Sequence, residues 1–252
     1  MEEELEALGH QQRELTGMLA PLSDADWSRP SACDGWTVGD VVLHLIQTND
    51  MAIASAEDRF DEVLTSPLYA PDDSVSSLDD MVDLAVQRAR GSSPSELLAQ
   101  WSAGCERLRT SLVAAGEHAR LPWIVGTLSA RTLATTRLAE TWIHTGDVAA
   151  GLGVEQSPGD PLRLIARLAW RTLPHAFGRE GLPAPGPVGF DLEGPSGEAW
   201  AFGMDDSPPT VIAGSAVDLC RVASKRSSAA DTDLVGTGPD AAEVLQLVRT
   251  WA

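Results

Sequence analysis

The stretch RLAETWIHTGD, residues 137–147, predicts the centre of a long helix that begins after Ser129 and ends near Gly151. Glu140 and His144 are four residues apart and Asp147 follows three later, so a helix places the three side chains on one face. A carboxylate and an imidazole on consecutive turns can bind one divalent ion, and a further carboxylate can accept the other ring N–H. Because such pairs are also common on solvated helices, the pattern needs a third ligand from elsewhere in the chain.

A second predicted helix offers that ligand. Thr37 is a plausible N-cap for a helix that runs to about Phe60, and Asp40 favours the positive end of its dipole. His44 lies in the middle of this helix, on a face of mixed polarity. Two interpretations stay open: His44 is a third metal ligand, or it is a partly buried histidine hydrogen-bonded across a pair of helices.

Apolar periodicity and turn residues predict an N-terminal helical bundle followed by a small α+β domain, at residues 1–154 and 155–252. The bundle helices are expected at residues 2–20, 37–60, 78–90, 94–115 and 129–151, with longer connections between them. In the second domain, a helix over residues 161–177 precedes three short strands at 188–192, 198–202 and 210–213, which predict an antiparallel meander. A helix at 215–224, a strand at 232–237 and a closing helix at 239–251 complete the domain.

The charge of the chain limits its partners. It carries 37 acidic and 18 basic residues in 252, a formal net charge of −19, which argues against nucleic acid or an anionic membrane surface as a partner. No apolar run reaches the length of a membrane span, and the first residues lack the basic and apolar regions of a signal peptide. The expected location is therefore the cytoplasm, with a small molecule as the partner and a monomer or homodimer as the assembly.

Cys33, Cys105 and Cys220 are odd in number and widely spaced, without a Cys-x-x-Cys pair. This spacing indicates neither a disulfide framework nor a cysteine-based zinc site. The three are expected to be small buried apolar residues with no chemical role.

Two segments resemble a known family. They are W-x-x-P-x-x-C-x-x-W-T-V-x-D-V-V-x-H-L, residues 27–45, and RLAETWIH-x-x-D, residues 137–147. Both resemble the DinB-like metalloprotein superfamily, in its mycothiol-dependent maleylpyruvate isomerase branch, and their order matches that branch's pattern of His followed by Glu-x-x-x-His. Residues 194–239 resemble the small domain called "wyosine base formation" that accompanies actinobacterial metal-binding members, although nothing in the sequence supports tRNA chemistry.

The resemblance implies a DinB-like four-helix bundle that holds zinc or another divalent metal through His44, Glu140 and His144. In such an enzyme, the metal activates the thiol of mycothiol, and the thiolate adds to a small electrophile, which is then isomerised or becomes thiol-linked. Asp147 is a candidate to orient an imidazole, with an exposed acid in the last helical turn as the alternative.

Four further residues are candidates for the pocket. Arg137, and with less support Arg131, could hold a substrate carboxylate, and Trp36 and Trp123 could wall the pocket, although all four also suit ordinary surface or core positions. Two other functions stay open: a metal-assisted lyase, hydrolase or cyclase of secondary metabolism that uses no thiol, and a binding protein in which the ion only braces the bundle.

Overall fold

The computed structural model describes residues 1–252 except 71, 73–74, 125, 160, 205–206 and 251–252. The chain folds into two compact units, Met1–Gln156 and Ser157–Ala252. The division between them falls close to the boundary expected after residue 154.

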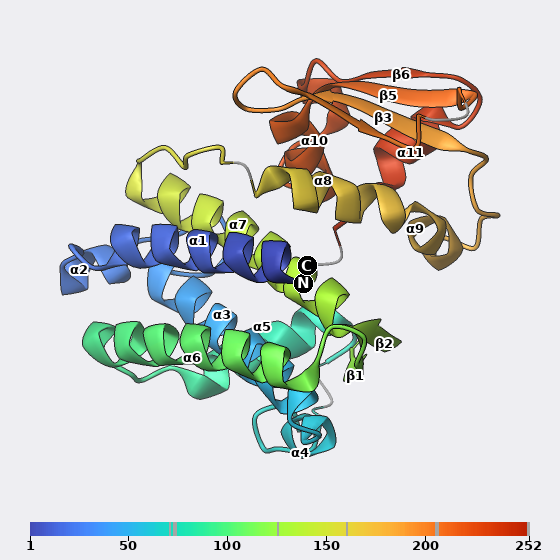
Figure 1. The fold of residues 1–252 in the computed structure, drawn as a ribbon. Helices are drawn as coiled ribbons and strands as arrows, with labels where there is room; N and C mark the ends of the chain where they lie inside the picture. The colour runs from blue at the N-terminus through green and yellow to red at the C-terminus, as the bar shows by residue number, and fades with distance from the viewer. Residues whose placement is uncertain (71, 73–74, 125, 160, 205–206, 251–252) are drawn as a thin grey trace. The chain divides into compact units, whose positions relative to one another are not determined.

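Four long helices dominate the first unit (Figure 1): α1 (Glu2–Leu19), α3 (Val38–Ala56), α6 (Pro94–Ala115) and α7 (Ala130–Leu152). Helix α3 packs against α6 and α7, and α1 packs against α6 and α7. Three shorter helices, α2 (Asp24–Trp27), α4 (Phe60–Leu64) and α5 (Leu78–Ala89), lie between them in the chain. The helix-rich first unit confirms the predicted class, and the candidate ligands lie on the neighbouring helices α3 and α7.

Local sequence signals explain where α3 and α7 begin. Thr37 and Asp40 form a capping box at the start of α3, in which each side chain bonds the other residue's backbone N–H. Ser129 caps α7 by accepting the N–H of Thr132, and α7 ends at Leu152, before Gly153, whose φ of 73° is left-handed. These caps fix the register of the two helices that carry the candidate metal ligands.

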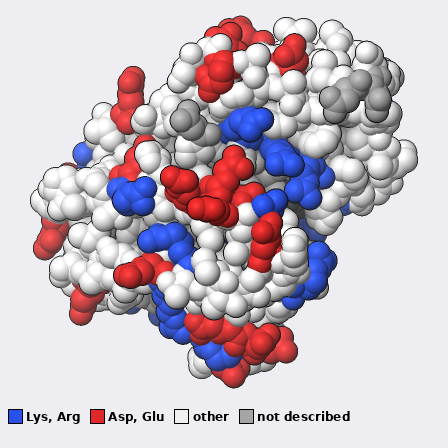
Figure 2. All heavy atoms as spheres, in the orientation of Figure 1, with Lys and Arg blue, Asp and Glu red and all other residues white. Residues whose placement is uncertain are grey.

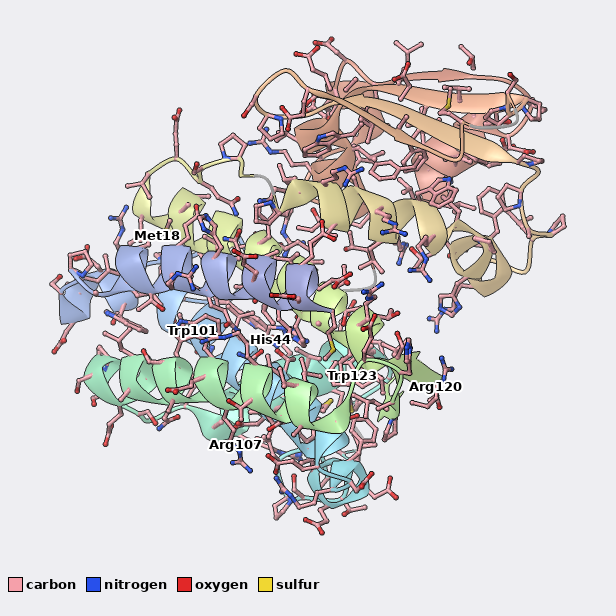
Figure 3. The ribbon with its side chains drawn as sticks, in the orientation of Figure 1. Met18, His44, Trp101, Arg107, Arg120 and Trp123 are labelled. Atoms are coloured by element: carbon pink, nitrogen blue, oxygen red, sulfur yellow. The ribbon has the colours of Figure 1, made fainter. Side chains whose placement is uncertain are left out.

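The interior of the first unit contains large apolar side chains together with bonded polar ones. Trp101 and Leu45 are fully buried, and the Trp101 indole N–H donates to Thr16 Oγ1 at 3.0 Å (Trp101 is labelled in Figure 3). On α7, every residue from Leu133 to Thr145 is buried. Thr141 and Thr145 satisfy their hydroxyls by donating to carbonyl oxygens one turn earlier, each at 2.7 Å, which lets polar residues lie inside the unit.

Two predictions for the first unit were wrong in detail. The helix that begins after Thr37 ends at Ala56 instead of Phe60, and a separate short helix, α4, follows Asp58, whose φ is 57°. Residues 116–127 were expected only as a break, but β1 (Arg120–Trp123) and β2 (Gly126–Ser129) form an antiparallel hairpin. Each strand has four residues and the sequence alternates too briefly to predict it.

The second unit is a small α+β fold. It contains α8 (Leu162–Arg171), α9 (Leu173–Arg179), β3 (Val188–Glu193), β4 (Ala199–Phe202), β5 (Thr210–Ser215), α10 (Ala216–Ala223), a 3₁₀ turn at Ala229–Asp231, β6 (Val235–Thr237) and α11 (Ala241–Leu247). The predicted helix over residues 161–177 is in fact two helices, separated at Thr172. The predicted closing helix over residues 239–251 is shorter in the structure, where α11 ends at Leu247; its last predicted residue, 251, lies outside the described residues.

The sheet of the second unit is mixed, and the predicted antiparallel meander is therefore wrong. The strand order is β4-β3-β5-β6, with β3 parallel to β5 and the other two pairs antiparallel. After β4 the chain passes to the far side of β3, so β5 runs in the same direction as β3. The first three residues of β3, Val188 to Phe190, are all buried, as expected for a central strand. The turn residues before Thr210, however, do not indicate which strand β5 pairs with.

No helix of the described residues is long and apolar enough to cross a membrane. Asp and Glu side chains are spread over the face shown in Figure 2, with Lys and Arg among them. This distribution accords with the net charge of −19.

Candidate metal centre

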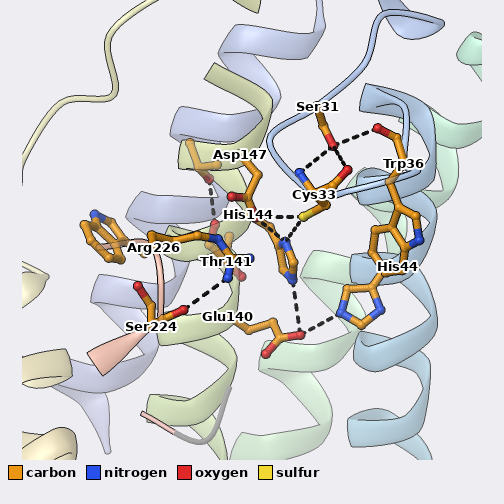
Figure 4. A network of polar contacts seen from close by, with 12 residues as sticks. Ser31, Cys33, Trp36, His44, Glu140, Thr141, His144, Asp147, Ser224 and Arg226 are labelled. Atoms are coloured by element: carbon orange, nitrogen blue, oxygen red, sulfur yellow. Dashed lines mark hydrogen bonds and ion pairs between the residues drawn. The ribbon is translucent and has the colours of Figure 1, made fainter. Parts of the chain in front are cut away.

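His44 of α3 meets Glu140 and His144 of α7 inside the first unit (Figure 4). Nε2 of His44 lies 2.7 Å from Oε1 of Glu140, and Nε2 of His144 lies 3.6 Å from the same oxygen. The two imidazole centroids are 4.9 Å apart, with the rings at 73° to each other. The three donor atoms lie within 4.8 Å of one another, which is a separation that one divalent ion can span with small side-chain movements.

The electrostatics of Glu140 and His44 suit a cation. Burial alone would raise the pKa of Glu140, but the charge of Arg137 and hydrogen bonds from the two histidines outweigh it and hold that pKa well below its ordinary value. Burial lowers the pKa of His44, despite its hydrogen bond to Glu140, and so favours the neutral imidazole that binds metals. A carboxylate and a neutral imidazole are therefore present at ordinary pH.

His144 is held by a second network on its other nitrogen. Nδ1 lies 2.9 Å from Oδ2 of Asp147 and 3.8 Å from Sγ of Cys33, and that sulfur lies 3.1 Å from Oδ2 of Asp147. Although burial lowers the pKa of His144, contacts with Asp147, Cys33 and Glu140 raise it well above its ordinary value. A metal on Nε2 would therefore displace a proton from the ring.

Cys33 is the site residue that sequence reasoning missed. All three cysteines were expected to be buried and without a role; Cys105 and Cys220 are buried, but Cys33 is half-buried and contacts the site. The geometry differs from a Cys-His-Asp catalytic triad, because Cys33 and Asp147 face the same ring nitrogen of His144, whereas a triad uses opposite nitrogens. The W-x-x-P-x-x-C-x-x-W spacing was the only available signal.

The loop over residues 30–36 places Cys33 and Trp36 beside the histidines. The N–H of Ala32 donates to the carbonyl oxygen of Asp147 at 3.1 Å, which ties the loop to α7. The Trp36 ring lies 5.1 Å from the His44 ring and 6.5 Å from the His144 ring, between centroids, and its indole N–H bonds Asp83. Trp36 therefore covers part of the candidate centre.

Arg137 lies next to the centre, whereas Arg131 does not. The Arg137 side chain is almost fully buried, with Nη2 3.8 Å from Oε1 of Glu140 and its guanidinium carbon 5.8 Å from the centroid of the buried Trp123 ring. Among the described residues, Nε and Nη2 of Arg137 find no hydrogen-bond acceptor. Arg131, in the first turn of α7, instead pairs with Glu117 at 2.7 Å and with Glu4 at 3.4 Å.

Most of the first unit matches a known protein family. Residues 8–149 match the family described as the mycothiol maleylpyruvate isomerase N-terminal domain. The chain belongs to this family. Two relatives are uncharacterized proteins of Mycobacterium tuberculosis, from the strains CDC 1551 / Oshkosh and ATCC 25618 / H37Rv; each is 34% identical over 242 residues, covering 95% of this chain and 91% of the relative.

Two solved structures of the mycothiol-dependent maleylpyruvate isomerase have a similar fold. The crystal structure of the mycothiol-dependent maleylpyruvate isomerase is similar with a TM-score of 0.62 and 19% identity, and a histidine-to-alanine mutant of that enzyme with a TM-score of 0.61 and 20% identity. Each likeness covers 93% of this chain and 92% of the other. At this identity the likeness shows the fold of the chain alone.

Close packing between α7 and the loop over residues 30–36 gives a first testable prediction. A Cβ at Gly151 would lie 2.5 Å from the carbonyl oxygen of Pro30 and 2.9 Å from Cα of Ser31. Because the backbone would have to move, we expect Gly151→Ala to lower the free energy of unfolding by about 1–3 kcal/mol in urea titrations. The control is Gly104→Ala on α6, which has open space around it and should gain about 0.5–1 kcal/mol. Equal effects at the two glycines would contradict the prediction.

Proposed function

We propose that this protein is a metal-dependent enzyme that activates a low-molecular-weight thiol, such as mycothiol, and isomerises a small electrophilic substrate or transfers the thiol to it. The observation that carries the proposal is the meeting of two imidazoles and one carboxylate from α3 and α7, in a chain of the maleylpyruvate isomerase family. Two histidines and a glutamate are the protein ligands of some catalytic zinc sites, which keep a position open for an exogenous ligand.

The proposed ligands are His44 Nε2, Glu140 Oε1 and His144 Nε2, and the helices α1, α3, α6 and α7 would form the DinB-like four-helix bundle around them. Zinc or another divalent ion bound there would lower the pKa of an incoming thiol, so that a nucleophilic thiolate is available at neutral pH. Asp147 would accept the Nδ1–H of His144 and so keep the Nε2 lone pair directed at the ion.

The substrate would be held by the remaining side chains. Arg137 has a buried guanidinium whose Nε and Nη2 find no acceptor among the described residues, and leaving a buried donor unsatisfied costs about 1–3 kcal/mol, which a substrate carboxylate would remove. The Trp123 ring would fix the guanidinium plane, and Trp36 would exclude water from the histidine side. Arg131 is left out of the proposed site, because two acidic side chains already pair its charge.

The reaction that fits these groups is reversible thiol addition. Addition of the thiolate sulfur to a cis double bond conjugated with a carbonyl group, rotation about the resulting single bond and expulsion of the sulfur give the trans isomer and return the thiol. Without the expulsion, protonation of the adduct leaves the thiol attached to the substrate. Arg137 would hold the substrate carboxylate during the rotation. A cytoplasmic location, with its reduced thiol pool, accords with this use of a free thiol.

The test uses the cobalt-substituted protein. Mycothiol added to it is expected to produce a new sulfur-to-cobalt charge-transfer band. Thiol-free buffer is the blank. The Arg137→Met variant serves as a second protein in which the three metal ligands are retained. Absence of the band at saturating mycothiol, with cobalt fully bound, would contradict the use of a thiol and favour the thiol-independent lyase, hydrolase or cyclase.

A further inference from the structure

His144 faces two different groups of metal-ligating side chains through its two ring nitrogens. Nε2 belongs to the set with His44 and Glu140, whereas Nδ1 belongs to a set with Cys33 and Asp147 (Figure 4). In the second set, the sulfur, the nitrogen and the carboxylate oxygen all lie within 4.8 Å of one another. The two sets thus share one histidine and differ in that only the second contains sulfur.

The spacing of the second set is compatible with one ion. Metal–sulfur bonds of about 2.3 Å and metal–nitrogen or metal–oxygen bonds of about 2.0–2.2 Å place tetrahedral donors roughly 3–4 Å apart. The observed separations are 2.9 Å from Nδ1 to Oδ2 of Asp147, 3.1 Å from Oδ2 to Sγ, and 3.8 Å from Sγ to Nδ1. Small side-chain movements are therefore sufficient to bind an ion.

We propose that Cys33, His144 and Asp147 form a second metal-binding position, which takes thiophilic ions such as Cd²⁺ and competes with the first set for His144. A thiolate ligand selects soft ions, whereas the nitrogen and oxygen donors of His44 and Glu140 give no such preference. Cys33 is half-buried, whereas Cys105 and Cys220 are buried, so Cys33 is the cysteine that an ion can approach. Coordination of its sulfur releases the thiol proton to solvent.

The competition follows from the electrons of the imidazole ring. A neutral imidazole has one lone pair in the ring plane, on the nitrogen that carries no proton. When an ion binds Nδ1, the proton of the neutral ring is on Nε2. Nε2 then has no lone pair with which to bind the ion of the first set. Asp147 would also change from a hydrogen-bond acceptor of His144 to a ligand. This competition rests on the proposed function, whereas binding at the second position does not.

The binding test titrates the metal-free full-length protein with Cd²⁺ and follows the ultraviolet sulfur-to-cadmium charge-transfer absorption. The wild type is expected to show this absorption at one Cd²⁺ per chain. Cys33→Ser, which keeps a hydroxyl donor toward Asp147, is expected to lose it and, because a direct ligand is removed, to bind Cd²⁺ more than about 100-fold more weakly. Cys105→Ala and His44→Ala should retain it. Its persistence in Cys33→Ser, or its loss in His44→Ala, would overturn the proposal.

The competition test adds one equivalent of Cd²⁺ to the cobalt-loaded protein. We expect the visible cobalt absorption to fall as the sulfur-to-cadmium absorption grows, and Cys33→Ser to retain its cobalt under the same conditions. Stable binding of both ions to one chain would overturn the competition. If the wild type binds no cobalt, the proposed function fails at its metal, while the cadmium titration still decides whether the second position exists.

Discussion

Replacement of His44 by alanine is expected to leave the set with Glu140 and His144 unable to hold a stoichiometric zinc ion. His44 supplies the sole proposed ligand from α3, and its Nε2 lies 2.7 Å from Oε1 of Glu140. Loss of a partner that only orients a metal ligand costs about 10–100-fold in affinity, so removal of a direct ligand should cost more than about 100-fold. Zinc content after dialysis and competition with a chelator of known affinity measure the effect.

The control for His44→Ala is His118→Ala, because His118 is exposed and lies outside the donor sets. A second variant, His44→Gln, keeps a polar side chain against Glu140 and guards against a loss of fold, which far-ultraviolet circular dichroism checks. Full metal content in both folded His44 variants would disprove the proposed ligand set. It would also remove the main physical support for the proposed function.

Replacement of Asp147 by asparagine is expected to weaken metal binding by about 10–100-fold, although the two side chains have nearly the same shape. An ionised carboxylate accepts hydrogen bonds and cannot donate them. Asp147 therefore accepts the Nδ1–H of His144, at 2.9 Å, and keeps the lone pair of the ring on Nε2. The amide of asparagine can instead donate to Nδ1, which would favour the tautomer that has its proton on Nε2. The measurement is metal affinity by isothermal titration, together with turnover once a substrate is known.

Asp191→Asn is a matched control for Asp147→Asn, since it makes the same change at an exposed position of β3. Its metal affinity should equal that of the wild type. If Asp147→Asn also binds the metal as tightly as the wild type, the carboxylate does not set the tautomer of His144. Asp147 would then be a structural acid on α7 that bonds the loop over residues 30–36.

The helices were more predictable than the sheet, for a physical reason. Thr37, Ser93 and Ser129 are N-caps whose partners lie three residues away in the chain, so the sequence carries the whole signal. Strand pairing joins residues that are far apart in the chain. Thr210 pairs with Val188 in a parallel register that no local pattern indicates, which is why the meander was predicted wrongly.

The same distinction applies to the candidate site. The spacing of Glu140 and His144 follows from the helical repeat, so their common face could be derived from the residues alone. The approach of His44 could not, because it depends on how α3 packs on α7, and the expectation came from the family resemblance. Cys33 was missed because it lies in a loop, where no periodicity tells which side chain turns toward a helix.

The continuous burial of α7 from Leu133 to Thr145 constrains how this protein can change over evolution. Nearly four turns of helix lie without an exposed side chain, so a change of size at one position has to be matched by a neighbour. Gln11 of α1, which donates to Thr145 at 3.3 Å, is one such neighbour. Sequence drift in this helix should therefore leave correlated substitutions across α1, α3 and α7, whereas the exposed loops are free to vary one residue at a time.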